Sequence, residues 1–234
     1  MFYIGVLRKK SLNKDTPLPI LETAFTYWNT VIEEMRILDI TDGYLNTSQS
    51  YYAYQKHIGK PIPRILEGLF ICDKLYGMEG YSESFGLVRY EKSGISSWSS
   101  DPTFLNSFTL FARANGTGSM YAFWNIDPDL EKCPIVVFGD EGGVYLVCET
   151  LTEFIHLLSF DNEISVSWED AYFYHNEEYY EETYSHPEFL EWIKEEYSLD
   201  KITEEEVEKI IEGVRQKYGN AFNEFLLKYG VVQG

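Results

Sequence analysis

The chain has 234 residues, of which 44% are hydrophobic and 17% are aromatic, so it can form a substantial core. Its formal net charge is −19, from 38 acidic and 19 basic residues, which disfavours binding to nucleic acid phosphates or anionic lipid headgroups and favours a basic partner. No apolar run is long enough to cross a bilayer, and the first charges follow a short apolar stretch, the reverse of a secretory signal. These features predict a cytoplasmic protein that binds neither nucleic acid nor membrane.

The sequence pattern changes near residue 85. We interpret residues 1–84 as an N-terminal helical elaboration packed on a main domain at 85–234, the two forming one compact unit. Within the first part, residues 1–7 alternate like a short strand, residues 21–38 have apolar side chains at helical spacing, and Pro63 can begin another helix.

The main domain begins with five short segments rich in β-branched and aromatic residues, each bounded by Gly, Asn, Asp or Pro. Along the third segment, one set of apolar residues (Met120, Ala122, Trp124) alternates with another (Tyr121, Phe123), so helices must cover both faces. The pattern predicts an α+β fold with an antiparallel sheet of about five or six strands flanked by helices. The predicted strands are residues 85–91, 107–113, 119–126, 134–139 and 143–149.

The helices that follow the strands share one N-terminal signal, a hydroxyl residue three positions ahead of a Glu. This capping-box pattern predicts helices that begin after Thr150, Ser185 and Thr203. The last of them is predicted to end at Gly219, with a separate amphipathic segment at 221–230.

Two glycine-bearing loops, 115–118 and 139–143, join predicted strands and raise the question of ligand binding. Asn115-Gly116 between alternating segments is typical of a hairpin turn whose two central residues have positive φ. The Lys and hydroxyl residue of a phosphate-binding loop are missing, and a strand rather than a helix follows. We interpret both loops as turns and predict no cofactor and no metal. Four nearby acids could ligate a metal but lack the spacing of a calcium-binding loop: Asp127, Asp129, Asp140 and Glu141.

Patterns of catalytic residues are equally weak. No Ser lies in a nucleophile elbow, no Cys has a base beside it in sequence, and the excess of acids makes any one carboxylate pair uninformative. We therefore predict no enzyme, with an acid/base or metal-dependent hydrolase as the less favoured alternative. Cys72, Cys133 and Cys148 are predicted to be buried thiols, because free cysteine behaves as a small hydrophobe. The histidines show no metal-ligand spacing: His57, His156, His175 and His186.

The tract from Asp161 to Glu212 is strongly acidic, with eighteen Asp or Glu against three Lys, and is also rich in aromatic residues. Its segment HNEEYYEE, residues 175–182, has two interpretations. One is a solvated helix face. The other is a recognition surface, because Tyr interleaved with carboxylates offers contact area together with steering of a cationic partner. The candidate protein-binding residues are Glu177, Glu178, Tyr179, Tyr180, Glu181 and Glu182, with Asp140 and Glu141.

The stretch FARANGTGSMYAFWNID…CPIVVFGDEGGVYLVCETLTEFIHLL resembles the central signature of the SUKH superfamily, named for a fungal cell-wall synthesis regulator and its bacterial relatives. HPEFLEWIKEEYSL resembles the family's later Phe-x-x-Trp helix through Phe189 and Trp192, so the likeness covers roughly residues 85–230. Asp140 stands where the family usually has a small hydroxyl residue. The other signature positions are Gly116, Gly118, Trp124, Pro134, Gly139, Glu141 and Gly142.

The resemblance implies a curved antiparallel sheet flanked by helices, no enzymatic activity, and a role in binding other proteins. Bacterial members of the family often act as immunity proteins against polymorphic toxins, including nucleases, which agrees with the acidic charge. The favoured interpretation is therefore an immunity protein that neutralises a toxin domain with a basic surface. The alternative is a regulatory scaffold that binds a cellular partner, as the fungal relatives suggest.

Overall fold

A computed structural model of the chain describes residues 54–231, apart from 77–79, 84, 88–92, 175–177 and 179. The chain divides into two compact units, 1–49 and 50–234, and all described residues belong to the second. The strand predicted at 1–7 and the helix predicted at 21–38 lie outside the described residues.

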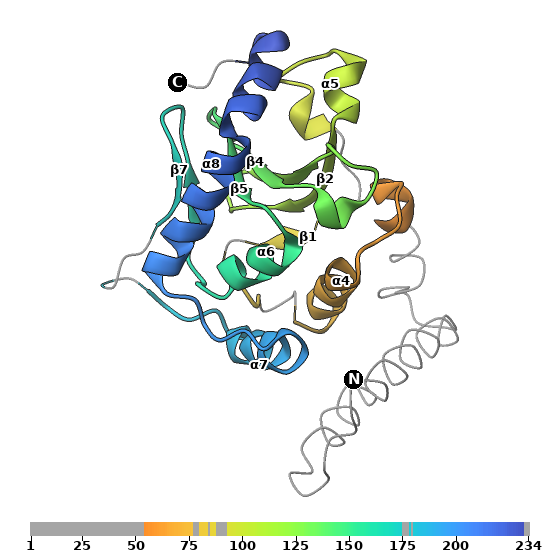
Figure 1. Cartoon of the computed structure of the whole chain (residues 1–234). Helices are drawn as coiled ribbons and strands as arrows, with labels where there is room; N and C mark the ends of the chain where they lie inside the picture. The colour runs from red at the N-terminus through yellow and green to blue at the C-terminus, as the bar shows by residue number, and fades with distance from the viewer. Residues whose placement is uncertain are drawn as a thin grey trace, which may run out of the picture. The chain divides into compact units, whose positions relative to one another are not determined.

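A five-stranded antiparallel sheet in sequential order forms the centre of the described unit (Figure 1). The predicted α+β class is confirmed, and each of the five predicted strand segments contributes one strand. The pairing register of the second and third strands shifts between Leu110 and Ala112. The strands are β1 (Gly86–Leu87), β2 (Phe108–Arg113), β3 (Met120–Trp124), β4 (Ile135–Phe138) and β5 (Val144–Cys148).

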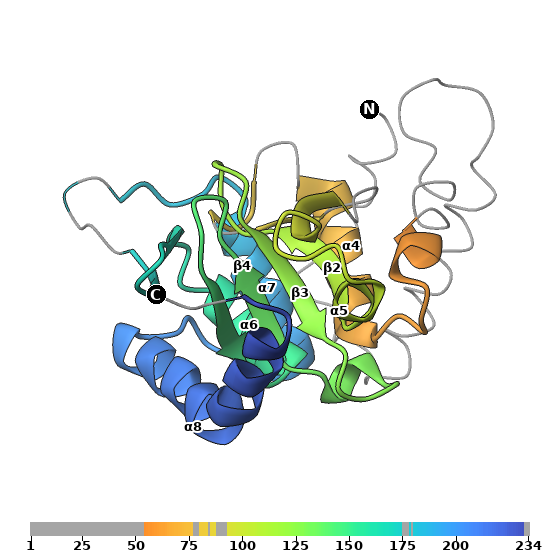
Figure 2. The ribbon, with the colours of Figure 1, turned by 90° about the horizontal axis from the view of Figure 1, so that it is seen from above.

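Both faces of the sheet are buried, as the alternation in β3 predicts. Tyr121 and Phe123 belong to one apolar cluster, which includes α4 (Arg64–Tyr76), α6 (Leu151–Leu158) and α7 (His186–Tyr197). Met120, Ala122 and Trp124 belong to a second cluster on the opposite face. That face is covered by α5 (Pro102–Asn106) and by α8 (Glu204–Lys228), which packs along β5 (Figure 2). Side chains that alternate along one strand therefore enter two separate cores.

Two of the three predicted capping boxes are present. The hydroxyls of Thr150 and Thr203 accept from the backbone N–H three residues on, and the Glu at each of those positions reaches back to the cap. The predicted helix does begin after Ser185, but the capping box there is wrong, because the Ser185 side chain makes no capping hydrogen bond. Its Oγ is buried without a hydrogen-bond partner among the described residues.

The C-terminal helix differs from the prediction because α8 does not end at Gly219. It continues to Lys228, so the predicted last segment is part of the same helix. Val214, Phe222 and Leu226 lie on one stripe and pack in the second core. A glycine in a helix interior costs only about 1 kcal/mol, less than the burial of a large apolar side chain contributes.

A two-stranded antiparallel sheet, β6 (Ile164–Val166) and β7 (Ala171–Phe173), follows α6 and has no counterpart in the predicted strands. The chain then passes through the acidic segment to α7. Glu178 and residues 180–182 of this segment are not helical, so the interpretation as a solvated helix face is wrong for its described part.

Candidate functional site

The loop that joins β2 to β3 is organised by one side chain. Asn115 Oδ1 accepts hydrogen bonds from Gly118 N (3.0 Å) and Ser119 N (2.9 Å), and it lies 2.9 Å from Thr117 Oγ1. The predicted hairpin is confirmed, but the predicted turn type is wrong. That type requires positive φ at Asn115 and Gly116, whereas the residue of this loop with positive φ is Gly118. The Asn carboxamide replaces the backbone acceptor of a tight turn, so its oxygen is used within the loop.

The loop that joins β4 to β5 needs its glycines for close packing. Gly142 and Gly143 have φ of +129° and +82°. A Cβ at Gly143 would overlap the carbonyl oxygen of Ser167, and a Cβ at Gly142 would overlap the ring of Trp168. Both glycines therefore let the tip of the β6–β7 hairpin lie directly on this loop.

Asp140 links the two glycine loops. Its carboxylate accepts from Ser119 Oγ (2.7 Å) and Thr117 Oγ1 (3.0 Å), both in the neighbouring hairpin loop. Partial burial acts to raise the pKa of Asp140, but these hydrogen bonds outweigh it and hold the pKa below its ordinary value. The two loops are thus turns that support each other, and they use the polar atoms that a ligand would need.

Two of the acids considered as metal ligands, Asp127 and Asp129, have local structural roles. Asp127 accepts from the backbone N–H of Asp129, and Asp129 accepts from the N–H of Glu131 and pairs with Lys132 at 3.4 Å. Within the described ranges, no group of three or more His, Cys, Asp and Glu side chains could hold a metal ion.

The β6–β7 hairpin is fixed by side chains from three other elements, each donating to a backbone carbonyl. Asn115 Nδ2 donates to Ile164 O at 3.3 Å, and Tyr145 Oη donates to Trp168 O at 2.7 Å. Arg215 of α8 donates to Ala171 O at 3.0 Å and pairs with the Asp170 carboxylate at 2.7 Å. The hairpin backbone is therefore held in one position although it is not part of the main sheet.

Exposed aromatic side chains are concentrated on this hairpin and on the segment that follows it. Six large hydrophobic side chains are exposed in the described part of the chain, and four of them lie between residues 168 and 184. Trp168, 56% exposed, lies over Gly142 with its ring centroid 6.0 Å from that of Trp98. The other three are Tyr172 (49%), Tyr174 (52%) and Tyr184 (70%).

The same region is uniformly acidic, since residues 161–185 contain eight Asp or Glu and no Lys or Arg. Glu163 and Glu169 are exposed on the hairpin, and Glu178, Glu181 and Glu182 are exposed on the segment that follows. A basic surface could therefore meet aromatic area and negative charge together. We name the exposed acidic and aromatic residues within 163–184 the acidic aromatic surface, leaving out Asp170, which pairs with Arg215. Its members are Glu163, Trp168, Glu169, Tyr172, Tyr174, Glu178, Glu181, Glu182 and Tyr184.

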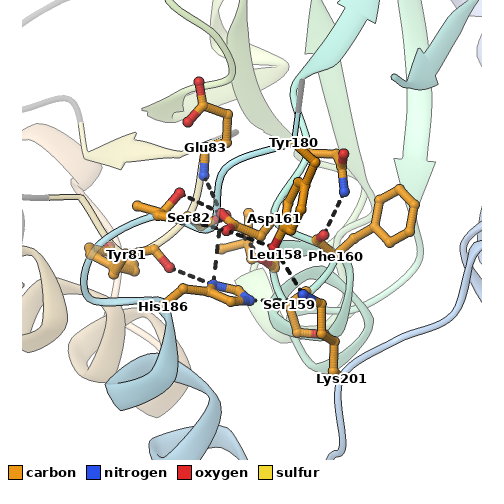
Figure 3. A network of polar contacts seen from close by, with 12 residues as sticks. Tyr81, Ser82, Glu83, Leu158, Ser159, Phe160, Asp161, Tyr180, His186 and Lys201 are labelled. Atoms are coloured by element: carbon orange, nitrogen blue, oxygen red, sulfur yellow. Dashed lines mark hydrogen bonds and ion pairs between the residues drawn. The ribbon is translucent and has the colours of Figure 1, made fainter. Parts of the chain in front are cut away.

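The predicted site residues fall into three groups. Glu178, Glu181 and Glu182 belong to the acidic aromatic surface, and Glu141 is exposed beside Gly142, on which Trp168 lies. Asp140 is exposed but is used to join the two loops. Tyr180 is half-buried: its hydroxyl donates to Asp161 at 3.4 Å and accepts from Lys201 at 3.0 Å (Figure 3). Glu177 and Tyr179 lie outside the described residues.

Sequence reasoning missed the aromatic members of this surface as site residues. A signal was present for two of them, because Tyr172 and Tyr174 alternate with the buried Phe173 as on a half-buried strand. For Trp168 and Tyr184 no local pattern distinguishes an exposed ring from a core ring.

The remaining signature residues are structural. The Trp124 ring packs against Phe222 of α8, and the Trp124 backbone N–H donates to the Pro134 carbonyl at 2.9 Å. Trp192 lies over Gly68 of α4, where a Cβ would overlap the indole ring. Gly116 and Gly118 are exposed in the β2–β3 loop, and Gly139 is buried. The prediction of buried thiols is confirmed for Cys72, Cys133 and Cys148, and burial raises the pKa of the Cys148 thiol.

No protein-family model, no curated protein and no solved structure matches this chain. The resemblance to the SUKH superfamily therefore stays a prediction from the motifs. None of the helices in the described residues is long and apolar enough to span a membrane.

Proposed function

We propose that this protein is a non-enzymatic binding protein that neutralises a toxin domain in the cytoplasm by direct contact, as an immunity protein. The toxin domain presents a basic surface, which meets the acidic aromatic surface. The observation that carries the proposal is the concentration of exposed aromatic rings, between residues 168 and 184, within a stretch that contains no Lys or Arg.

Charge supports a basic partner. The exposed carboxylates of this stretch outnumber the cations Arg215 and Lys201, which contact Asp170 and Tyr180. Such an excess of negative charge repels nucleic acid and anionic lipid, and it attracts a cationic protein over a distance of about 8–10 Å at physiological salt. Such steering raises association rates by roughly ten- to a thousandfold. A protein that must neutralise a toxin before damage accumulates benefits from fast association.

The fixed hairpin supports tight binding. Its backbone carbonyls at Ile164, Trp168 and Ala171 already accept hydrogen bonds from other elements. A partner therefore meets a surface that is largely ordered beforehand, which lowers the entropic cost of association. Exposed Tyr and Trp side chains are typical of residues that contribute most to protein interfaces.

The test uses the product of the gene adjacent to this one as the probe, with binding kinetics measured at low and high salt. Glu181→Lys with Glu182→Lys is expected to slow association by about tenfold and to flatten its dependence on salt. The matched control, Glu131→Lys with Glu224→Lys, changes the net charge equally at exposed positions of η2 (Leu130–Lys132) and α8.

An equal effect of both double variants would reduce the result to net charge and remove the acidic aromatic surface from the interface. Absence of binding by the unaltered protein would contradict the immunity function for this probe.

A further inference from the structure

His186, the first residue of α7, is fully buried with both ring nitrogens facing carbonyl oxygens (Figure 3). Nδ1 lies 2.9 Å from Tyr81 O, and Nε2 lies 3.2 Å from Ser159 O. A carbonyl oxygen can only accept, whereas a neutral imidazole has one N–H and one lone pair. In the neutral ring, one lone pair would face a carbonyl oxygen. Only the doubly protonated ring satisfies both contacts.

The counter-charge is also buried. The Asp161 carboxylate is fully buried, with Oδ1 3.8 Å from His186 Nδ1. It accepts from Glu83 N (2.9 Å), Thr183 N (2.8 Å) and Thr183 Oγ1 (2.6 Å). A protonated carboxyl would place its own O–H among these donors, so the ionised form fits the site. A buried charge is stable when it is both paired and hydrogen-bonded, and each member of this pair meets that condition.

We propose that His186 and Asp161 form a buried imidazolium–carboxylate pair that positions residues 180–185 for partner binding. The pair itself stands independently, while its role in binding rests on the proposed function. Neither residue is part of the exposed surface, so both act through the segment that they hold.

The contacts of the pair explain how the segment is held. Thr183 donates twice to Asp161, and its carbonyl accepts from His186 N at 2.8 Å. Tyr180 Oη reaches the same carboxylate, and Lys201 donates to the Tyr180 hydroxyl. Glu181 and Glu182 lie between these two attachment points and are exposed. The pair thus fixes both ends of a short acidic stretch.

The other ionisable groups that face the pair in the described residues are Glu83, Tyr180 and Lys201. Burial raises the pKa of Glu83, and the nearby Asp161 and Glu163 raise it further.

The first experiment records the ring nitrogens of the 15N-labelled full chain by long-range 1H–15N correlation at pH 6–8, with no partner present. The expected result is that both His186 nitrogens are protonated at pH 7, with the half-buried His156 as a reference in the same spectrum. An unprotonated ring nitrogen on His186 at pH 7 overturns the proposal. This measurement needs no variant and does not depend on whether a substituted protein folds.

The second experiment tests whether Asp161 positions the segment, through hydrogen exchange of the Thr183 amide, whose N–H donates to the Asp161 carboxylate. Asp161→Asn is expected to give a neutral His186 ring and to speed hydrogen exchange at Thr183 by about tenfold or more. Asp170→Asn is the matched control, because Asp170 pairs with Arg215 on the neighbouring hairpin and does not contact His186. Unchanged Thr183 exchange in Asp161→Asn overturns the positioning role.

Partner binding separates the two proposals. Asp161→Asn is expected to weaken binding of the adjacent gene product by about tenfold or more. Asp170→Asn is expected to lose less binding affinity than Asp161→Asn. A doubly protonated His186 without partner binding leaves the pair intact and contradicts the proposed function. A neutral ring together with salt-dependent binding contradicts the pair and leaves the proposed function intact.

Discussion

The two glycine loops and the acidic aromatic surface are both polar, irregular regions, but they use their side chains in opposite ways. In the loops, Asn115 and Asp140 direct their oxygens to hydroxyl and amide donors of the protein itself. On the surface, the hairpin backbone is held by other elements, while the carboxylates and rings point outward. The difference teaches that exposure, rather than polarity alone, distinguishes a candidate partner site from a polar loop that joins parts of the protein.

The largest expected effect tests whether the loop glycines are structural. Gly143→Ala should lower the free energy of unfolding by about 3–5 kcal/mol, because the new Cβ overlaps the Ser167 carbonyl at a positive φ. Urea unfolding measures the change. Gly116→Ala, with open space around its Cβ, is the control and should change stability by about 0.5 kcal/mol or less. Similar losses in both variants would contradict the packing explanation.

The next effect concerns the surface. Trp168→Ala should raise the dissociation rate of the partner by about thirtyfold, equivalent to about 2 kcal/mol, because it removes the largest exposed ring of the surface. The dissociation rate is measured with the adjacent gene product immobilised on a biosensor chip. Ile126→Ala, which truncates an exposed apolar side chain outside the surface, should leave the rate unchanged. If the two variants behave alike, Trp168 is not an anchor of the interface.

A smaller effect tests the internal use of Asp140 through pH. Its pKa is lowered in the folded protein, so its carboxylate contributes stability above the unfolded value near 3.9, and the contribution is lost as pH falls through the lower folded value. Asp140→Asn should cost about 1 kcal/mol or less at pH 6, because the group is exposed, and nothing once the carboxylate is protonated. Urea unfolding at several pH values measures the difference. A cost that persists at low pH would assign the effect to packing, and Glu141→Gln is the neighbouring control.

The smallest effect concerns a glycine that no contact requires. Gly219→Ala should stabilise the protein by about 0.5–1 kcal/mol, because the helix continues through this position and the Cβ would meet open space. Thermal or urea unfolding detects the gain. Destabilisation would show that α8 needs a break at Gly219 after all.

The sequence determined the elements whose signals are local. Alternation in residues 119–126 predicted β3 and its two buried faces, and the Thr–Glu pairs at 150–153 and 203–206 predicted where α6 and α8 begin. These patterns depend on neighbours within a few positions, so they survive whatever the rest of the chain does. The same pattern also predicted that α7 begins after Ser185, although the capping hydrogen bond is absent there. The local rule failed at Gly219, because apolar residues beyond it pack in the second core and α8 continues.

Only the tertiary structure decided which polar groups are used internally. Asp140 and Glu141 are adjacent in sequence, yet Asp140 joins two hairpins whereas Glu141 is exposed. His186 is distant in sequence from Tyr81 and Ser159, so no spacing rule relates them, although they form one buried network with Asp161. Composition determined that the protein is acidic and rich in aromatic residues. Long-range packing decided where those residues are exposed, because a side chain's solvent contact depends on segments that the local sequence does not contain.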